Sequence, residues 1–277
     1  MKKSLLAAAV LASFAASAFA APSVTLYGLI DTGISSFREH DSMTVGDLDN
    51  PPTAAFSYHR TRMTSGVADP SRWGLKGTED LGSLRVGFTL ESYFWSDDGT
   101  SNGRMFGRES QVNVSGAYGT LYAGSFYSIV STQGPFGYLT EVSAFPDSYT
   151  AAARQSGSTG SVSIIYDNAL AYETPHFAGF QAAAMYSSKT NGAIKTGTEN
   201  KADAGRYAAA GIRYKSGKAG AALAAEYTMY PNNGTVFGDL DNGFSVIAGG
   251  NYDFGPAKVF AKAAYFHNQY GIDDSLS

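Results

Sequence analysis

Charged side chains alternate with apolar ones along residues 71–94, SRWGLKGTEDLGSLRVGFTLESYF. Because successive side chains of a β-strand point to opposite faces, Arg72, Lys76 and Arg85 are predicted to share one face with Thr89 and Glu91. The opposite face carries Trp73, Leu75, Leu84, Val86, Phe88 and Leu90. Fixed charges of this kind attract or repel ions. In a soluble sandwich the charged face meets bulk water, whereas in a membrane barrel it lines a water-filled interior.

Residue types that support catalysis or metal binding are present, but without the spacing that either requires. The four histidines, at positions 40, 59, 176 and 267, lie on separate segments, away from the close spacing of a metal site. SGSTG at 156–160 lacks the first glycine of a GxSxG nucleophile elbow. GDLDN, at 46–50 and 238–242, is interpreted as a solvated loop, with Ca²⁺ binding as an alternative. The sequence otherwise predicts no cofactor, no metal site and no enzyme.

Alternating segments separated by turn residues predict about eleven antiparallel strands. These segments are residues 23–35, 58–76, 84–95, 104–116, 120–127, 162–172, 180–188, 206–214, 220–230, 244–254 and 257–270. Their connections alternate between tight turns and long polar loops, the longest being residues 128–160. This layout is typical of an outer-membrane barrel. Aromatic clusters at 93–95, 126–127, 252–254 and 265–270 are expected at the two membrane interfaces.

The N-terminus and the composition indicate an exported membrane protein. Residues 1–20, MKKSLLAAAVLASFAASAFA, have the basic start, apolar run and A-x-A end of a signal peptide. The formal net charge of -4 disfavours a nucleic-acid partner. The 32 glycines, 18 tyrosines and 17 phenylalanines suit the turns and interfacial aromatics of a barrel. The prediction for residues 21–277 is therefore one all-β domain, an antiparallel transmembrane β-barrel in the outer membrane.

Five segments resemble the general diffusion porins of Gram-negative bacteria, in their betaproteobacterial form. They are SVTLYGLIDTGI (23–34), SRWGLKGTEDLG (71–82), RMFGRESQVNVSGAYGTLYAG (104–124), AYETPHFAGFQAAAMY (171–186) and GNYDFGPAKVFA (250–261). The resemblance implies a sixteen-stranded barrel that assembles as a homotrimer among outer-membrane lipids. It also implies passive diffusion of ions and small hydrophilic solutes through a water-filled channel.

The same resemblance implies a charged constriction inside the channel. Arg72 of SRWGL and Arg108 of FGR match basic wall positions of the family, and Lys76 and Arg85 are expected on the same wall. A third basic position of the family falls on Ile165, so the positive wall is expected to be thinner here. The family pattern leans towards anions, and rings of side-chain charge set selectivity.

The loop at 128–160 is expected to fold back into the lumen and narrow it. Glu141 and Asp147 are the acids expected to face the basic wall from this loop, and Arg154 lies in its return limb. A connection of this length is usually functional.

About eleven strands do not reach the sixteen that the resemblance implies, so the barrel domain is predicted to be incomplete at its C-terminus. Unpaired edge groups in lipid are costly, and the 277-residue chain is expected not to insert as a stable pore by itself. Two alternatives stay open. One is an outer-membrane barrel enzyme of the protease or lipase type, and the other is a soluble, exported, β-rich adhesin.

Overall fold

The computed structural model describes residues 23–43, 54–67, 69–101, 103–144, 165–190, 197–231, 241–268 and 275–276. Its strands are β1 (Ser23–Leu29), β2 (Thr32–Met43), β3 (Ala54–Ser65), β4 (Arg72–Asp80), β5 (Leu84–Tyr93), β6 (Glu109–Gly116), β7 (Gly119–Tyr127), β8 (Ile165–Glu173), β9 (Phe180–Ser187), β10 (Arg206–Ser216), β11 (Ala219–Met229), β12 (Gly243–Asp253), β13 (Lys258–His267) and β14 (Ser275–Leu276). A short 3-10 helix, η1, spans Tyr138–Val142. No helix in the described ranges is long and apolar enough to cross a membrane.

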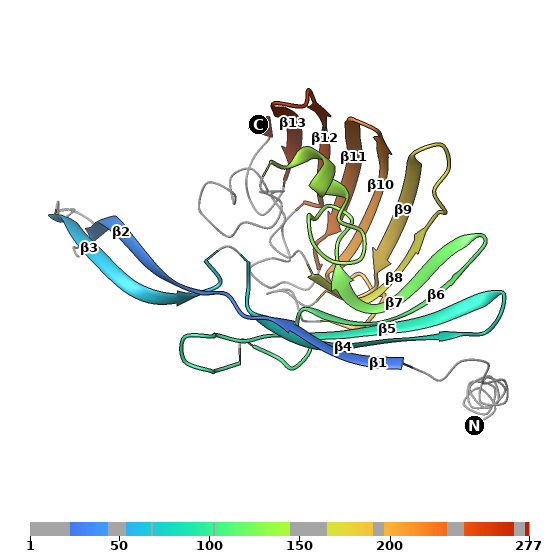
Figure 1. The fold of residues 1–277 in the computed structure, drawn as a ribbon, viewed down its shortest axis with the longest axis horizontal. Helices are drawn as coiled ribbons and strands as arrows, with labels where there is room; N and C mark the ends of the chain where they lie inside the picture. The colour runs from blue at the N-terminus through green and yellow to red at the C-terminus, as the bar shows by residue number, and fades with distance from the viewer. Residues whose placement is uncertain are drawn as a thin grey trace.

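One antiparallel sheet contains twelve of these strands, in the order β1-β4-β5-β6-β7-β8-β9-β10-β11-β12-β13-β14, and β2 pairs with β3 in a separate hairpin. The sheet curves strongly around an interior, and the β2–β3 hairpin extends away from it (Figure 1). From β4 onwards, each strand pairs with the next one in the chain. This up-and-down order confirms the predicted all-β antiparallel fold and the expected turns after β4, β6, β8, β10 and β12.

The outer surface of the sheet is apolar. Leu26, Leu121 and Leu170 are 69%, 60% and 65% exposed, and Val24, Ile212, Leu223 and Val259 are also exposed. Their neighbours along each strand point inwards, as the alternation predicted. A soluble protein seldom exposes so large an apolar surface, whereas lipid covers it at no cost. The outward face of these strands therefore suits a membrane.

The first two predicted strands are each interrupted by a bend. Asp31 lies between β1 and β2, and its carboxylate accepts hydrogen bonds from the backbone amides of Val67 (3.2 Å) and Asp69 (2.8 Å). Gly66, with φ of 70°, donates its amide to the Asp31 carbonyl at 2.8 Å. Positive φ favours glycine, so this bend is built into the sequence. Beyond it, β2 and β3 extend to Met43 and Ala54, into a region that was expected to be a loop.

Aromatic side chains divide between the membrane-facing surface and the interior. Tyr118, Phe177 and Phe254 are exposed at the end of the sheet that carries the short turns, which suits an interfacial girdle. Phe126 and Tyr127, expected at an interface, are instead fully buried. Phe266 is also buried, in the same cluster as Phe126. Position at a strand end thus does not decide whether an aromatic ring meets lipid or fills the interior.

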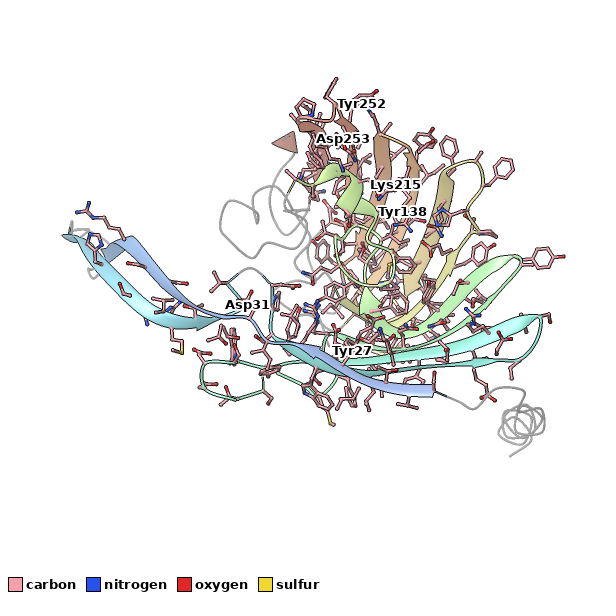
Figure 2. All side chains as sticks on the ribbon, in the orientation of Figure 1. Tyr27, Asp31, Tyr138, Lys215, Tyr252 and Asp253 are labelled. Atoms are coloured by element: carbon pink, nitrogen blue, oxygen red, sulfur yellow. The ribbon has the colours of Figure 1, made fainter. Side chains whose placement is uncertain are left out.

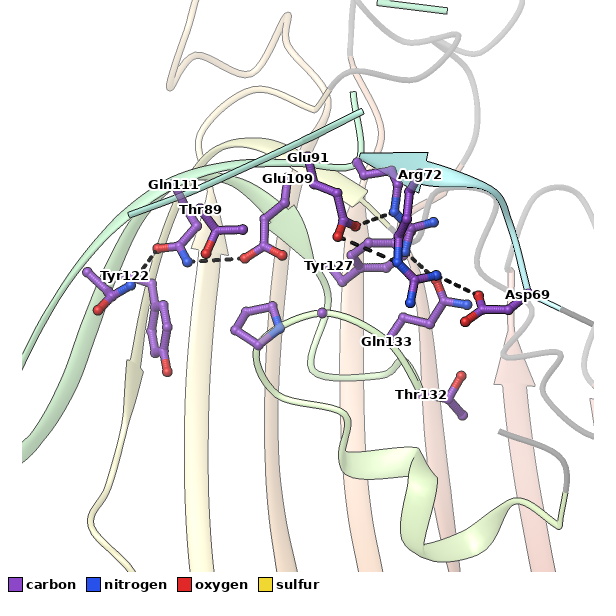
Figure 3. A pocket seen from close by; sticks show the side chains of 14 residues that line it. Asp69, Arg72, Thr89, Glu91, Glu109, Gln111, Tyr122, Tyr127, Thr132 and Gln133 are labelled. Carbon is purple, nitrogen blue, oxygen red and sulfur yellow. Dashed lines mark hydrogen bonds and ion pairs between the residues drawn. The ribbon is translucent and has the colours of Figure 1, made fainter. Parts of the chain in front are cut away.

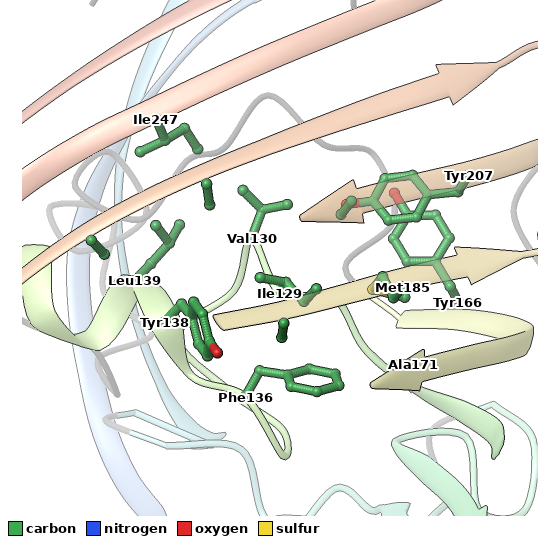
Figure 4. Close-up of a cluster of buried hydrophobic side chains, with 14 of the residues drawn as sticks. Ile129, Val130, Phe136, Tyr138, Leu139, Tyr166, Ala171, Met185, Tyr207 and Ile247 are labelled. Atoms are coloured by element: carbon green, nitrogen blue, oxygen red, sulfur yellow. The ribbon is translucent and has the colours of Figure 1, made fainter. Parts of the chain in front are cut away.

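The segment after β7 folds back inside the curve of the sheet, where η1 contacts β10, β11, β12 and β13. Ile129, Val130, Phe136 and Leu139 from this segment are buried against the inward side chains of β8–β13. Figure 4 shows this cluster, with Tyr138 and Leu139 of η1 and, across from them, Ile247. The described part of the expected fold-back loop, residues 128–144, therefore lies in the interior.

Candidate functional site

A polar cavity of about 530 Å³ lies between the inner face of β4–β7 and the fold-back segment. Its lining residues are Asp69, Arg72, Thr89, Glu91, Arg108, Glu109, Gln111, Asn113, Tyr122, Tyr127, Thr132, Gln133, Gly134 and Pro135. The strands contribute side chains from alternate positions, and the fold-back segment closes the opposite side with residues 132–135 (Figure 3). Two of the predicted wall arginines, Arg72 and Arg108, thus meet in one cavity.

Both arginines are neutralised by carboxylates. Arg72 Nη1 lies 2.8 Å from Asp69 Oδ1, and its Nε lies 3.6 Å from Glu91 Oε2. Arg108 Nε donates to Glu91 Oε1. The hydroxyl of Tyr27 donates to Glu91 Oε2 at 2.9 Å, so Glu91 is bound by three side chains. A positive wall was expected here, and the structure instead places an acidic partner between the two cations.

Arg108 is held firmly and is only 3% exposed. Its guanidinium carbon lies 4.3 Å from the centre of the Tyr93 ring and 5.4 Å from that of Tyr127. Its Nη2 donates to Gln133 Oε1 of the fold-back segment at 3.3 Å. Cation–π contacts of this type favour a charged guanidinium. Arg108 therefore connects the strand wall to the segment that narrows the interior.

A row of polar side chains continues along the inner face of β6. Asn113 Nδ2 donates to Gln111 Oε1 at 3.1 Å, and Gln111 Nε2 donates to Glu109 Oε1 at 3.1 Å. Alternation along the strand places these three residues on the same face. Asn113 packs over Gly87 of β5, where an added Cβ would lie 2.8 Å from Asn113 Oδ1. The narrow side chain at position 87 therefore leaves room for the row.

The opposite wall has a different character. Its inward faces on β8–β13 contribute, together with polar residues, a cluster of small or apolar ones: Ala169, Ala171, Ala183, Met185, Ala209, Ala222, Ala224, Ile247 and Ala264. Polar residues were expected to line the lumen. On this wall, apolar inward side chains are instead buried against the fold-back segment. Gly211 of β10 allows the closest approach, since an added Cβ would lie 2.9 Å from Ile129 Cγ2 and 3.1 Å from Tyr138 Cδ2.

Two cations on β10 hold the fold-back segment to this wall. Lys215 Nζ lies 3.0 Å from Glu141 Oε1 of η1. Arg213 Nη1 donates to the Phe136 carbonyl at 2.8 Å, and its guanidinium lies over the ring of Tyr138, 4.7 Å from the centre. Figure 2 shows Tyr138 and Lys215 inside the curve of the sheet. Burial raises the pKa of the Tyr138 hydroxyl well above its usual range, with Glu173 adding to the effect.

Asn251 and Gly220 complete the same anchor. Asn251 Nδ2 donates to the Glu141 carbonyl at 2.6 Å. A Cβ at Gly220 would lie 2.5 Å from Glu141 Oε2, so only glycine leaves room for this carboxylate. Glu141 is 6% exposed and is turned towards β10–β12. Glu141 was expected to face Arg72 and Arg108. The structure instead places it on the side of the fold-back segment that contacts β10–β12.

The remaining predicted wall residues lie apart from the cavity lining. Lys76 projects inwards two positions along β4 from Gly74, with its ammonium 5.0 Å from the centre of the Tyr27 ring. Arg85 lies beside the short turn after β4, where it pairs with Asp80 at 3.4 Å. Ile165 begins β8. Asp147, Arg154 and the signal peptide at 1–20 fall outside the described residues, as does the first GDLDN segment and all but Asp241 and Asn242 of the second.

Sequence reasoning did not single out Glu109, Arg213, Lys215 or Asn251. A signal for each was present, because all four occupy the polar face of an alternating segment. In GIRYKS, Arg213 and Lys215 are two positions apart and must share a face. In FGRES, Glu109 directly follows a residue that matched the family pattern. Alternation identifies the face, but it does not show what lies opposite.

Comparison with known proteins identifies the family. A family model described as Gram-negative porin matches residues 7–275. The chain belongs to this family. An outer membrane porin protein of Bordetella pertussis is 38% identical over 268 residues, which cover 94% of this chain and 68% of that protein. Outer membrane porin protein 32 of Delftia acidovorans is 32% identical over 264 residues, with the same coverage of 94% and 68%.

A solved structure agrees with this assignment. The anion-selective porin from Comamonas acidovorans matches with a TM-score of 0.57 and 26% sequence identity, covering 89% of this chain and 68% of that chain. This porin is therefore an outer-membrane β-barrel protein that forms a channel for passive diffusion. Its polar cavity lies where a solute crossing the interior would meet both the strand wall and the fold-back segment.

Proposed function

We propose that this porin is a non-enzymatic channel for ions and small hydrophilic solutes, and that its constriction lies between Arg72, Arg108 and Glu91 on one side and residues 132–135 on the other. The supporting observation is the contact from Arg108 to Gln133, which joins the strand wall to the fold-back segment. Charged side chains in a narrow, low-dielectric passage have a strong effect on the ions that pass. The constriction residues therefore decide which solutes cross quickly.

The proposal includes assembly as a homotrimer in the outer membrane. The exposed apolar strands leave a broad surface for lipid and for other subunits. Cross-linking in intact outer membranes, followed by electrophoresis with and without heating, tests the assembly. A single band at monomer mass before heating would contradict it.

The absence of cysteine from the chain allows a direct test of the constriction. Gln133→Cys places one thiol at the cavity, and Tyr118→Cys places one on an exposed turn at the end of the sheet. Both variants are expressed in a porin-deficient Gram-negative host, purified from outer membranes and inserted in planar lipid bilayers. A bulky thiol reagent should reduce the current through Gln133→Cys channels and leave Tyr118→Cys channels unchanged.

Three outcomes contradict parts of this proposal. If the protein is recovered from outer membranes as a folded, heat-modifiable barrel and still gives no stepwise conductance, the channel itself is wrong. If labelling at position 133 leaves the current intact, the constriction lies elsewhere. If the purified protein hydrolyses peptides or phospholipids and gives no conductance, a barrel enzyme is the better description.

A further inference from the structure

Two carboxylate side chains lie next to each other on the cavity wall, one on β5 and one on β6. In the β5–β6 register, Glu91 is directly opposite Glu109. Like charges at directly opposed positions of an antiparallel pair destabilise the sheet. Neighbouring side chains must therefore offset the repulsion between the two carboxylates. Glu91 and Glu109 receive different numbers of such partners.

Glu91 takes both of the available cations. Arg108 and Arg72 bind its two oxygens, and Tyr27 donates a further hydrogen bond. Glu109 makes no ion pair with any described residue, and Gln111 supplies its side-chain hydrogen bond. Figure 3 shows Glu109 between Gln111 and Glu91, at the rim of the open space. One carboxylate of the pair is thus neutralised, and the other is left with its charge.

Glu109 is buried beside the cavity, and a hydrogen bond offsets part of the cost of burying its carboxylate. Glu109 is 8% exposed; the Gln111 amide donates to its carboxylate, and the Asn113 amide donates in turn to Gln111 Oε1. A hydrogen-bond donor stabilises the charged form of an acid. When it is ionised, a carboxylate that borders a water-filled cavity and lacks a cation of its own attracts cations from the solution through its Coulomb field.

We propose that Glu109 is a specificity-determining residue, which makes the constriction of this porin prefer small cations, including organic ammonium ions, over anions. Among the described lining residues, two cations, Arg72 and Arg108, meet three carboxylates, Asp69, Glu91 and Glu109. The pairs to Arg72 and Arg108 cancel, and Glu109 supplies the remaining charge. This inference rests on the proposed channel function. It differs from the anion preference that the family pattern predicts and from the selectivity named for the Comamonas porin.

The test is the reversal potential of the channel across a planar bilayer with a potassium chloride gradient, at mildly alkaline pH. The unmodified protein should favour K⁺ over Cl⁻. Glu109→Gln keeps the size of the side chain and removes its charge. The cation-to-anion permeability ratio should fall by roughly tenfold or more, because a unit charge about 5 Å away in water favours a cation about fourfold and disfavours an anion by a similar factor.

Two further variants serve as controls. Glu109→Asp keeps the charge and should keep the cation preference, so a fall in both variants would point to altered packing and overturn the charge mechanism. Glu199→Gln makes the same chemical change at an exposed position, where Glu199 accepts a hydrogen bond from Ser188 Oγ at 2.5 Å. Its permeability ratio should match that of the unmodified protein.

The outcomes separate this inference from the channel proposal. Stepwise conductance with an anion-favouring reversal potential in the unmodified protein overturns the role of Glu109 and leaves the channel intact. The same holds if Glu109→Gln conducts with an unchanged ratio. Absence of conductance from unmodified protein that is inserted as a folded barrel overturns the channel and this inference together. The proposal is supported if the unmodified protein has a cation-favouring reversal potential and if, among these variants, only Glu109→Gln weakens it.

Discussion

The two inner walls of this porin follow the same strand alternation but reach opposite chemistry. On β4–β6 the inward positions carry charged and amide side chains, which surround a polar cavity. On β8–β13 the hydrophobic residues that point inwards are largely alanine, and the fold-back segment packs on them. The difference shows that an inward position in a barrel is not one environment. It is wet where the interior is open and dry where a segment of chain covers it.

The covered wall also uses charge in a different way. Arg213 and Lys215 contact the fold-back segment itself, through the Phe136 carbonyl and the Glu141 carboxylate. On the open wall, Arg72 and Arg108 bind acids of the wall and the adjoining bend, and Arg108 alone reaches across to Gln133. The cations of one wall position a loop, and those of the other shape the passage.

A polar side chain placed in the apolar cluster of the covered wall should have the largest effect on the free energy of unfolding. Ala222→Gln places a longer polar side chain in the dry cluster, where it must displace the fold-back segment or lose its hydrogen bonds. We expect a loss of about 3 kcal/mol in the free energy of unfolding, measured by urea titration in lipid vesicles. Thr89→Ala on the open wall should cost less than about 1 kcal/mol, because this partly exposed side chain lines the polar cavity, where water replaces its contacts. Equal losses would show that the two walls are equally packed.

Removing the partly buried cation of the covered wall, Arg213, should have the next largest effect. Arg213→Met keeps much of the side-chain volume but loses the hydrogen bonds to Phe136 and Gln181, and it leaves Glu173 without the cation 3.6 Å away. We expect a loss of about 2 kcal/mol in the free energy of unfolding and noisier single-channel currents. The control is Ile212→Met, on the outward face of the same strand. If Arg213→Met left the free energy of unfolding and the current noise unchanged, Arg213 would not be needed to hold the fold-back segment.

A charge change on the open wall should alter selectivity more than stability. Arg72→Glu should move the reversal potential towards cations, with a change in the permeability ratio well above about tenfold and larger than that of Glu109→Gln, because two units of charge change beside the cavity. Arg72→Gln should give a smaller shift in the same direction. Arg85→Glu is the comparison, since Arg85 pairs with Asp80 beside a short turn and should change the ratio less than about twofold. Equal shifts at the two positions would argue against a local constriction.

Alternation in the sequence determined the strands, the two faces and the rhythm of turns, because side-chain direction depends only on the backbone. SRWGLKG places Arg72 and Lys76 inside and Trp73 and Leu75 outside without any tertiary information. The motif resemblance was sufficient to place Arg72 and Arg108 on the same wall. The breaks at residues 30–31 and 66–71 were missed because they depend on hydrogen bonds to Asp31 from residues more than thirty positions away.

Only the tertiary structure decided which charges meet. Glu141 was expected to face the arginines, but Lys215 and Asn251 bind it on the other wall. In the sequence, Glu91 is one of several polar residues on its strand. The strand register places it between Arg108 and Arg72 and opposite Glu109. The physical reason is that alternation fixes the direction of a side chain, whereas its partner depends on strand register and on the path of the fold-back segment. Both of these are set by packing between residues that are distant in the chain.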